Sequence, residues 1–423
     1  MNKIIGRLWL LYFSLIILFT FQYQNLKILL LIVIFINSII FSRLYFSKFT
    51  LYWYILYLVF NIIFLILGIL NNGIIILRFY LLSEIISLFT YFFLFNIVIL
   101  KKKIYLEGLE KIYKIGFGIT IGIIFIYYFD YNHSFKVLNK FLQIIEKIIE
   151  VKKIYRPGQY NKITASIPML ATMSFIIPYI TTDLFQRKKL EYIKITILNI
   201  FILLLIIFSM RKALIVIYII SLLINLFIFY LYNKKMFFKS IFKLISLNMI
   251  LLFFFFMLNK YYNFIDFDNT IEYIKKSFDY TRKNFDFAGV SERKIQFKYL
   301  IKAWLNDIGT FLIGQGTGSN VEIVRSEIPG QYELTYIAML FQRGIVGIIY
   351  YFGLIYSIYY KYYTLIKQNY IKEKEKKIIF KYGNGFLGIL MYNFMNPTLI
   401  SFEFIWIVFI NLYVIEIVEG EKK

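Results

Sequence analysis

Cysteine is absent from this chain of 423 residues, and histidine occurs once, as His133. The absence of cysteine excludes disulfides, Cys-ligated zinc and thiol catalysis. A single histidine leaves the large loop over residues 259–333 without candidates for a His-based metal site, a Ser-His-Asp triad or a histidine general base. The run GQGTGSN lacks the Lys-Ser/Thr ending of a P-loop, so an ATP-driven pump is not expected either. We therefore predict no metal and no cofactor.

Acidic residues are also scarce. The chain has 48 Lys and Arg against 24 Asp and Glu, a net charge of +24, while 60% of its residues are hydrophobic. Soluble domains contain about 45 to 50% apolar residues, so this composition predicts an integral membrane protein. In such a protein, basic residues mostly keep loops in the cytoplasm and contact anionic head groups. We expect membrane lipids as partners, and no nucleic acid.

Long apolar runs predict an all-α polytopic membrane protein with about 12 transmembrane helices. The runs lie near residues 4–21, 27–46, 51–70, 74–100, 112–130, 164–182, 193–208, 212–232, 241–258, 334–360, 379–395 and 398–418. The first run has a basic start but no small-residue cleavage site, so we predict an uncleaved first helix.

Basic residues in the short loops predict the topology, because such loops resist translocation. With the amino terminus in the cytoplasm, every short basic loop falls on that side, and so does the carboxyl terminus. The cytoplasmic groups include Arg43 and Lys48, Lys101 to Lys103, Arg187 to Lys189, Lys234 and Lys235, and Lys361 to Lys381. The chain then divides into nine spans over 1–258 with an interfacial segment at 131–163, a large extracytoplasmic loop over 259–333, and three spans over 334–423.

The two outer segments carry recognisable patterns. In 131–163, the residues Phe135, Leu138, Leu142, Ile145 and Ile149 share one helical face, which predicts a helix lying in the membrane interface, followed by a turn at residues 156–158. In the large loop we predict a short helix over 269–284 and a second beginning at Ser291, a good N-cap. Its apolar face would be Phe297, Leu300, Ile301 and Trp304, and Lys294, Lys298 and Lys302 would form a basic ridge.

Arginines and a few acids at the outer face are the candidate functional residues. Arg211 opens a helix after a short outer turn. Its guanidinium could bind a phosphate group bidentately, or it could only extend to the membrane surface to stay in water. Glu333 could act as a general base or form a salt bridge with a loop arginine. Four arginines are further candidates, each with an ordinary solvated or anchoring role as the alternative, and Glu403 is a weaker acid candidate. They are Arg78, Arg156, Arg293 and Arg325. Arg78 and Glu84 lie in or near one span, six residues apart, which is not an ideal helical spacing.

These features, in this order, resemble the bacterial O-antigen polymerase and O-antigen ligase superfamily. The segments are FSMRKALIVIYIISLL, SERKIQFKYLIKAWLNDIGTFLIGQGTGS, YELTYIAMLFQRGIVGIIYYFGLIY, RPGQYNKITASIPMLATMSF and NPTLISFEF. Together they cover most of the second half of the chain. Each segment by itself matches only a loose pattern. The resemblance rests on the order of the segments, their spacing and the side of the membrane on which they lie. Ligases of this superfamily are expected to have a histidine where the large loop meets the next span, and this chain has Tyr332 and Glu333 there. The difference favours a polymerase.

The resemblance implies a metal-independent glycosyltransferase of the bacterial inner membrane. It would transfer glycan from an undecaprenyl diphosphate carrier to another lipid-linked repeat unit, for O-antigen or capsule, alongside a flippase and a chain-length regulator. Arginines would stabilise the leaving diphosphate, with Arg211 and Arg293 first and Arg78, Arg156 and Arg325 in support, and Glu333 would accept the proton. The alternatives are an O-antigen ligase and, in another class, a lipid-linked oligosaccharide flippase or transporter.

Overall fold

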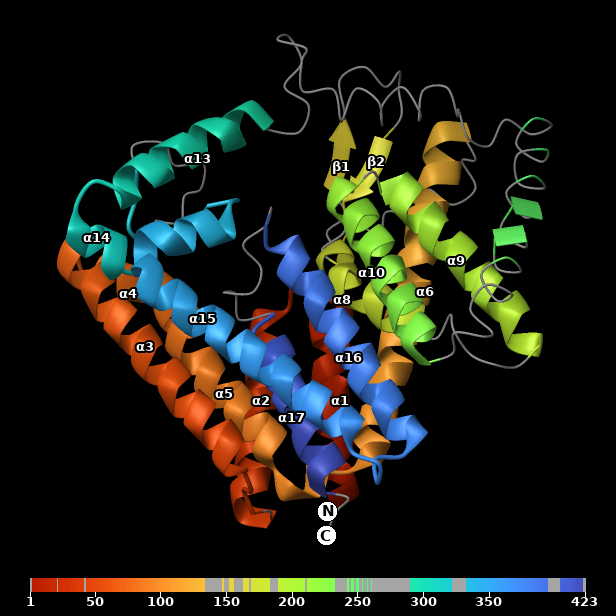
Figure 1. The fold of residues 1–423 in the computed structure, drawn as a ribbon, viewed down its shortest axis with the longest axis horizontal. Coiled ribbons are helices and arrows are strands. Elements are labelled where there is room, and N and C mark those ends of the chain that lie inside the picture. Colours follow the sequence, from red (N-terminus) through yellow and green to blue (C-terminus); the bar gives the residue numbers. More distant parts are fainter. Residues whose placement is uncertain are drawn as a thin grey trace. The chain divides into compact units, whose positions relative to one another are not determined.

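The computed structural model describes the chain in a set of segments separated by gaps. They are residues 2–20, 22–41, 43–133, 147, 152–155, 163–166, 169–182, 189–209, 211–232, 242, 245–246, 249–250, 253, 257, 260, 290–321, 332–394 and 404–420. The described residues are mostly helical, which agrees with the all-α prediction, and include one short two-stranded sheet (Figure 1).

Three helical stretches among the described residues are long and apolar enough to cross a membrane: Lys48–Asn72, Ile75–Asn96 and Thr335–Lys367. This agrees with a membrane protein, while the number of about 12 spans stays a prediction. The other helices that overlap predicted spans are α1 (Asn2–Leu18), α2 (Gln24–Phe41), α6 (Lys103–His133), α8 (Met169–Thr181), α9 (Lys189–Ser209), α10 (Lys212–Tyr232), α16 (Glu373–Tyr392) and α17 (Trp406–Gly420). Most of the predicted span at 241–258 lies outside the described residues.

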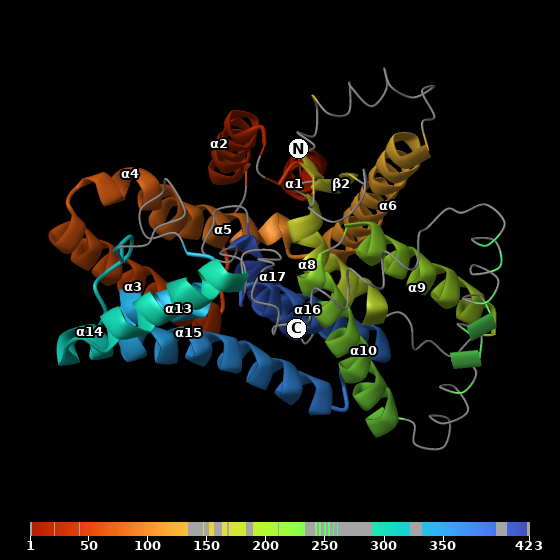
Figure 2. The ribbon, with the colours of Figure 1, turned by 90° about the horizontal axis from the view of Figure 1, so that it is seen from above.

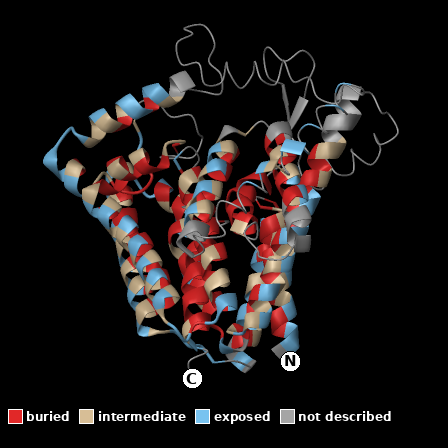
Figure 3. Cartoon of the chain, turned by 45° about the vertical axis from the view of Figure 1, so that its right-hand side comes forward, coloured by how far each residue is buried: buried red, intermediate tan, exposed pale blue. Residues whose placement is uncertain are grey.

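The chain forms two compact units, the first of which contains residues 1–16, 23–112 and 289–423. Its remaining elements are α3 (Lys48–Asn72), α4 (Ile75–Leu81), the π-helix η1 (Leu82–Ile86), α5 (Ser87–Asn96), the 3₁₀ turn η2 (Val98–Leu100), α13 (Val290–Trp304), α14 (Ile308–Leu312) and α15 (Thr335–Lys367). Helix α17 is buried from Trp406 to Val418 and forms part of the unit's core (Figure 3).

Aromatic packing joins the helices of this core. The Trp9 ring on α1 lies 5.8 Å from that of Phe95 on α5 and 6.1 Å from that of Tyr413 on α17. All three side chains are buried. Large aromatic surfaces removed from solvent supply much of the packing energy of such a core, so α1, α5 and α17 form a fixed frame for the rest of the first unit.

The second unit, residues 17–22 and 113–288, contains α8, α9, α10 and the sheet. Every residue of α8 is buried. The hydroxyls of Thr181 on α8 and Ser221 on α10 lie 2.6 Å apart, and the Asn225 amide donates to Thr181. Hydrogen bonds of this kind join apolar helices that have no polar solvent to satisfy them.

The sheet corrects two predictions about the first outer segment. Strand β1 (Lys152–Tyr155) pairs antiparallel with β2 (Ile163–Ser166), so the interfacial helix does not extend to Lys152, and residues 163–166 are not the start of the sixth span. Backbone pairing between the strands satisfies amides that the helical pattern would have satisfied locally. The five apolar residues of the predicted face, the turn at 156–158 and the helix predicted over 269–284 lie outside the described residues.

Candidate functional site

Helix α13 forms where the second loop helix was predicted, with two differences. Ser291 lies inside the helix, one residue after its start. The three lysines of the ridge are exposed as predicted, but Phe297 is 47% exposed, while Gln296 is 2% exposed. The buried face, which includes Gln296, Leu300, Ala303 and Trp304, is therefore rotated by about one residue from the predicted one.

The rotation has a polar cause at the start of α15. The Gln296 side-chain oxygen accepts hydrogen bonds from the backbone amides of Glu333, at 3.2 Å, and Leu334, at 3.4 Å. Amides at the start of a helix have no partner within it, and a side chain from a neighbouring element can satisfy them. Gln296 on α13 thus caps α15 from a neighbouring helix, and the two helices lie side by side in both views (Figures 1 and 2).

Glu333 forms an ion pair with Arg293 across this contact. Nε of Arg293 lies 2.6 Å from a carboxylate oxygen of Glu333, and the side chains are 28% and 32% exposed. This confirms the simpler of the two predictions for Glu333, a salt bridge to a loop arginine. The two side chains are thus partly exposed, although the atoms that meet, Nε of Arg293 and one carboxylate oxygen of Glu333, are buried.

Tyr332, the residue before Glu333, fixes the same junction from the other side. Its hydroxyl accepts from the backbone amide of Val321 at 2.7 Å and donates to the carbonyl of Ser319 at 3.2 Å. Burial raises the pKa of Tyr332 to about 12, so the phenol is neutral at physiological pH. Tyr332 therefore ties the end of the glycine run to the residues that lead into α15.

The glycine run GQGTG docks directly on two helices. Gly314, Gly316 and Gly318 have φ angles of 82°, 86° and 83°, which favour glycine. The amides of Gln315 and Gly316 donate to the carbonyls of Phe341 and Gln342 on α15, at 3.0 and 2.8 Å. These carbonyls are available because α15 is interrupted at Gly344, where φ is 60°.

The same run packs backbone to backbone against α3. The amide of Thr317 donates to the carbonyl of Phe64 at 2.8 Å. A Cβ atom at Gly68 would collide with the carbonyl of Thr317, and one at Gly316 would collide with the backbone of Gly68. No side chain fits at either position, so the loop is held against α3 and α15 at a fixed place.

A second ion pair lies within the helices of the first unit. Nη2 of Arg343 on α15 is 2.5 Å from a carboxylate oxygen of Glu84 in the π-helix η1, and Nη1 donates to the Asn61 side-chain oxygen at 3.0 Å. The two charged side chains are 6% and 4% exposed. The amide of Asn61 in turn donates to the carbonyl of Tyr57 at 2.8 Å, which orients its oxygen toward Arg343. An intramembrane charge tolerates burial only with such partners.

This pair was missed by the sequence reasoning, which compared Glu84 with Arg78 on the same stretch of helix. Arg78 lies in the last turn of α4 and is exposed, whereas Glu84 contacts Arg343 from a distant part of the chain. A usable signal was present. The predicted span 74–100 contains the acidic Glu84, and the predicted span 334–360 contains the basic Arg343. Opposite charges within the membrane tend to pair.

The remaining candidates are not brought to this site by the structure. Arg211 lies directly before α10, half-buried, as predicted for an arginine that opens a helix, and it belongs to the second unit. Its proximity to Arg293 and Glu333 stays a prediction. Arg156, Arg325 and Glu403 lie outside the described residues. Within the described segments, no group of three or more His, Asp or Glu could hold a metal ion.

The chain matches no protein-family model, no curated protein and no solved structure. The resemblance to O-antigen polymerases and ligases therefore stays a prediction from the sequence motifs.

Proposed function

We propose that this protein is a polysaccharide repeat-unit polymerase that acts at the outer face of the bacterial inner membrane. The observation that supports it best is the Arg293–Glu333 pair, which places a carboxylate and a guanidinium 2.6 Å apart, partly exposed, where the large loop meets α15. The reaction needs both groups, one for the acceptor hydroxyl and one for the leaving diphosphate.

The proposed reaction is a single glycosyl transfer. The acceptor hydroxyl of one lipid-linked repeat unit attacks the anomeric carbon of a glycan on a second carrier, and its proton passes to Glu333. The bond from the anomeric carbon to the diphosphate oxygen breaks, and undecaprenyl diphosphate leaves with the electron pair. The donor supplies the bond energy, so the transfer requires no nucleotide.

Arg293 has a double role in this proposal. In the resting protein its ion pair orients the Glu333 carboxylate. The diphosphate of an arriving donor competes for the guanidinium, which binds such oxygens bidentately, and frees the carboxylate for the acceptor. Negative charge grows on the leaving oxygen during the reaction, so Arg293 stabilises the transition state more than the bound substrate. Arg211, Arg78, Arg156 and Arg325 are proposed as further contacts to the diphosphate and glycan.

Several contacts hold the residues around Glu333 in place, as a catalytic site requires. Gln296, Tyr332 and the glycine run each fix the junction that carries Glu333. A catalytic base needs to be held within hydrogen-bond reach of the proton that it accepts, and these contacts fix Glu333 although it lies two residues before α15.

The test is polymerisation by the purified full-length protein supplied with lipid-linked repeat units, read as a ladder on a gel. We expect Glu333→Gln and Arg293→Gln to yield glycans of one repeat only, with rates reduced by about 10² to 10⁴ for the base. Arg211→Ala should give the same product. Lys298→Ala, which removes an exposed cation from the same helix as Arg293, should leave the ladder unchanged. Full-length polymer from both the Glu333 and the Arg211 variants would overturn the proposal.

One observation favours a second candidate, a lipid-linked oligosaccharide carrier. The Glu84–Arg343 pair lies inside the helices, and Nε of Arg343 is buried with no hydrogen-bond partner among the described residues. Intramembrane charges often mark a transport pathway. In proteoliposomes, a carrier would move lipid-linked glycan across the bilayer and lose this activity in Glu84→Gln, without ever producing a ladder.

A further inference from the structure

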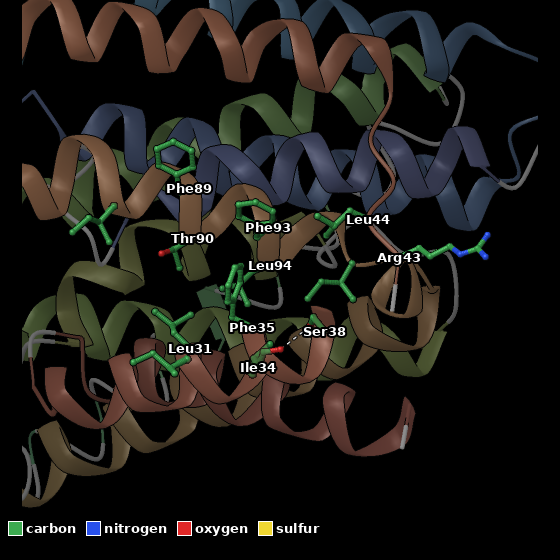
Figure 4. A pocket seen from close by; sticks show the side chains of 13 residues that line it. Leu31, Ile34, Phe35, Ser38, Arg43, Leu44, Phe89, Thr90, Phe93 and Leu94 are labelled. Atoms are coloured by element: carbon green, nitrogen blue, oxygen red, sulfur yellow. Dashed lines mark hydrogen bonds between the residues drawn. The ribbon is translucent and has the colours of Figure 1, made fainter. Parts of the chain in front are cut away.

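A cavity of about 780 Å³ lies in the first unit between α2 and the η1–α5 stretch, away from the Arg293–Glu333 pair in both sequence and contacts. Its lining comes almost entirely from aliphatic and aromatic side chains, including Leu31, Phe35, Phe89 and Phe93 (Figure 4). The volume falls in the range of about 300 to 1,000 Å³ that ligand sites in proteins usually occupy. The cavity is therefore large enough to hold an apolar ligand.

Polar side chains are few in the lining: Ser38, Thr90 and Arg43. The Ser38 hydroxyl donates to the carbonyl of Ile34 on its own helix at 2.6 Å, so its hydrogen is already used. Phe35 and Phe89 on opposite walls are 43% and 42% exposed, which shows that the cavity opens to the surroundings of the protein. In a membrane protein those surroundings are acyl chains, and an apolar cavity open to them accepts a chain without losing hydrogen bonds.

Positive charge lies at one end of the cavity. Figure 4 shows Arg43 there, with its guanidinium directed away from the apolar side chains. The carbonyl of Arg43 accepts from the amide of Val98 at 3.0 Å, and Leu44 pairs with Ile97, so the backbone that carries Arg43 is fixed relative to the wall formed by α5. Lys102, a few residues beyond that wall, is exposed. The loops that carry Arg43 and Lys102 are the ones predicted to be cytoplasmic.

We propose that this cavity binds one anionic phospholipid of the cytoplasmic leaflet, with the phosphate at Arg43. An acyl chain would lie along Leu31 and the rings of Phe35 and Phe93, which contact each other with centroids 5.4 Å apart. Basic residues beside clefts between helices on the cytoplasmic side are known to bind acidic head groups. This site is separate from the proposed polymerase reaction, whose lipid-linked substrates present their diphosphates at the outer face.

The test is lipid retention by the purified full-length protein, measured by native mass spectrometry with phosphatidylglycerol and phosphatidylcholine supplied at equal concentrations. The wild type should retain phosphatidylglycerol several-fold better. Arg43→Gln should reduce this preference about fivefold, as expected for about 1 kcal/mol per basic residue at an anionic surface. Arg7→Gln, which removes another exposed arginine predicted to be cytoplasmic, should not change it.

Variants that fill the cavity test the contribution of the acyl chain to binding separately from that of the head group. Thr90→Phe should reduce the retention of both lipids, because the added ring occupies the space of the chain. Ser38→Leu fills the cavity from α2 and should act in the same way if Thr90→Phe fails to fold. Equal retention of the two lipids, or a preference that survives Arg43→Gln, would overturn the proposal. So would Arg43-dependent binding of undecaprenyl phosphate in preference to phosphatidylglycerol, which would assign the cavity to the carrier lipid.

Discussion

Two ion pairs in the first unit differ in their exposure to solvent. One includes Arg343 on α15, and the other joins Arg293 on α13 to Glu333, two residues before α15 begins. Arg343 and Glu84 are 6% and 4% exposed and share hydrogen bonds with the surrounding helices. Arg293 and Glu333 are 28% and 32% exposed at the edge of the bundle. A buried charge is costly to leave alone, whereas an exposed pair contributes little to stability and exchanges partners readily. The buried pair is therefore suited to holding the helices together, and the partly exposed pair is the one that we propose to meet substrate.

Breaking the buried pair should have the largest effect on stability. Arg343→Ala leaves the Glu84 carboxylate buried without its partner, which costs about 3 to 5 kcal/mol in comparable cases. We expect a large fall in the apparent melting temperature of the detergent-purified protein, measured by fluorescence-detected size-exclusion chromatography after heating. Because Asn61 also loses its donor, the loss of one side chain disturbs α3, η1 and α15 together.

The matched control for this variant removes both charges. Glu84→Met combined with Arg343→Met leaves no unpaired charge, and replacing a buried ion pair with apolar residues is often neutral or stabilising. The double variant should therefore be more stable than Arg343→Ala. If it is equally unstable, or if Arg343→Ala melts like the wild type, the buried pair does not hold the helices. If the double variant folds but cannot polymerise, the pair also positions the catalytic junction.

A smaller effect is expected where the glycine run meets α3. Gly316→Ala introduces a Cβ at a φ of 86°, directly against the backbone of Gly68, and costs about 1 to 3 kcal/mol in backbone strain alone. The run should then detach from α3 and α15 and become sensitive to protease in limited digestion. Gly420→Ala adds the same methyl group where nothing lies within 4 Å and serves as the control. An undigested Gly316→Ala protein would show that the run is not held by this contact.

Part of this arrangement could be predicted from the sequence. Helix α13 and its lysine ridge followed from local periodicity, and the ion pair of Glu333 with a loop arginine followed from charge at the membrane edge. The partner of Glu84 could not be found in this way, because Arg343 is 259 residues distant and only tertiary packing joins them. The rotated face of α13 was missed for a related reason. Gln296 is buried where it accepts hydrogen bonds from the amides that lead into α15, and a hydrophobic pattern cannot show that a polar side chain is needed there.

The smallest expected effect is on stability when the exposed pair is broken. Removing Arg293 or Glu333 should cost about 0 to 1 kcal/mol, because solvent and salt screen partly exposed charges. A double-mutant cycle with Arg293→Gln and Glu333→Gln should give a coupling energy below about 1 kcal/mol that shrinks as salt is raised. The same cycle on Arg343 and Glu84 should give a coupling of several kcal/mol that salt hardly changes. Similar couplings for both pairs would remove the distinction between a structural and a substrate-facing ion pair. A small coupling at Arg293–Glu333 together with the loss of polymerisation in each single variant would instead show that these charges serve the reaction and not the fold.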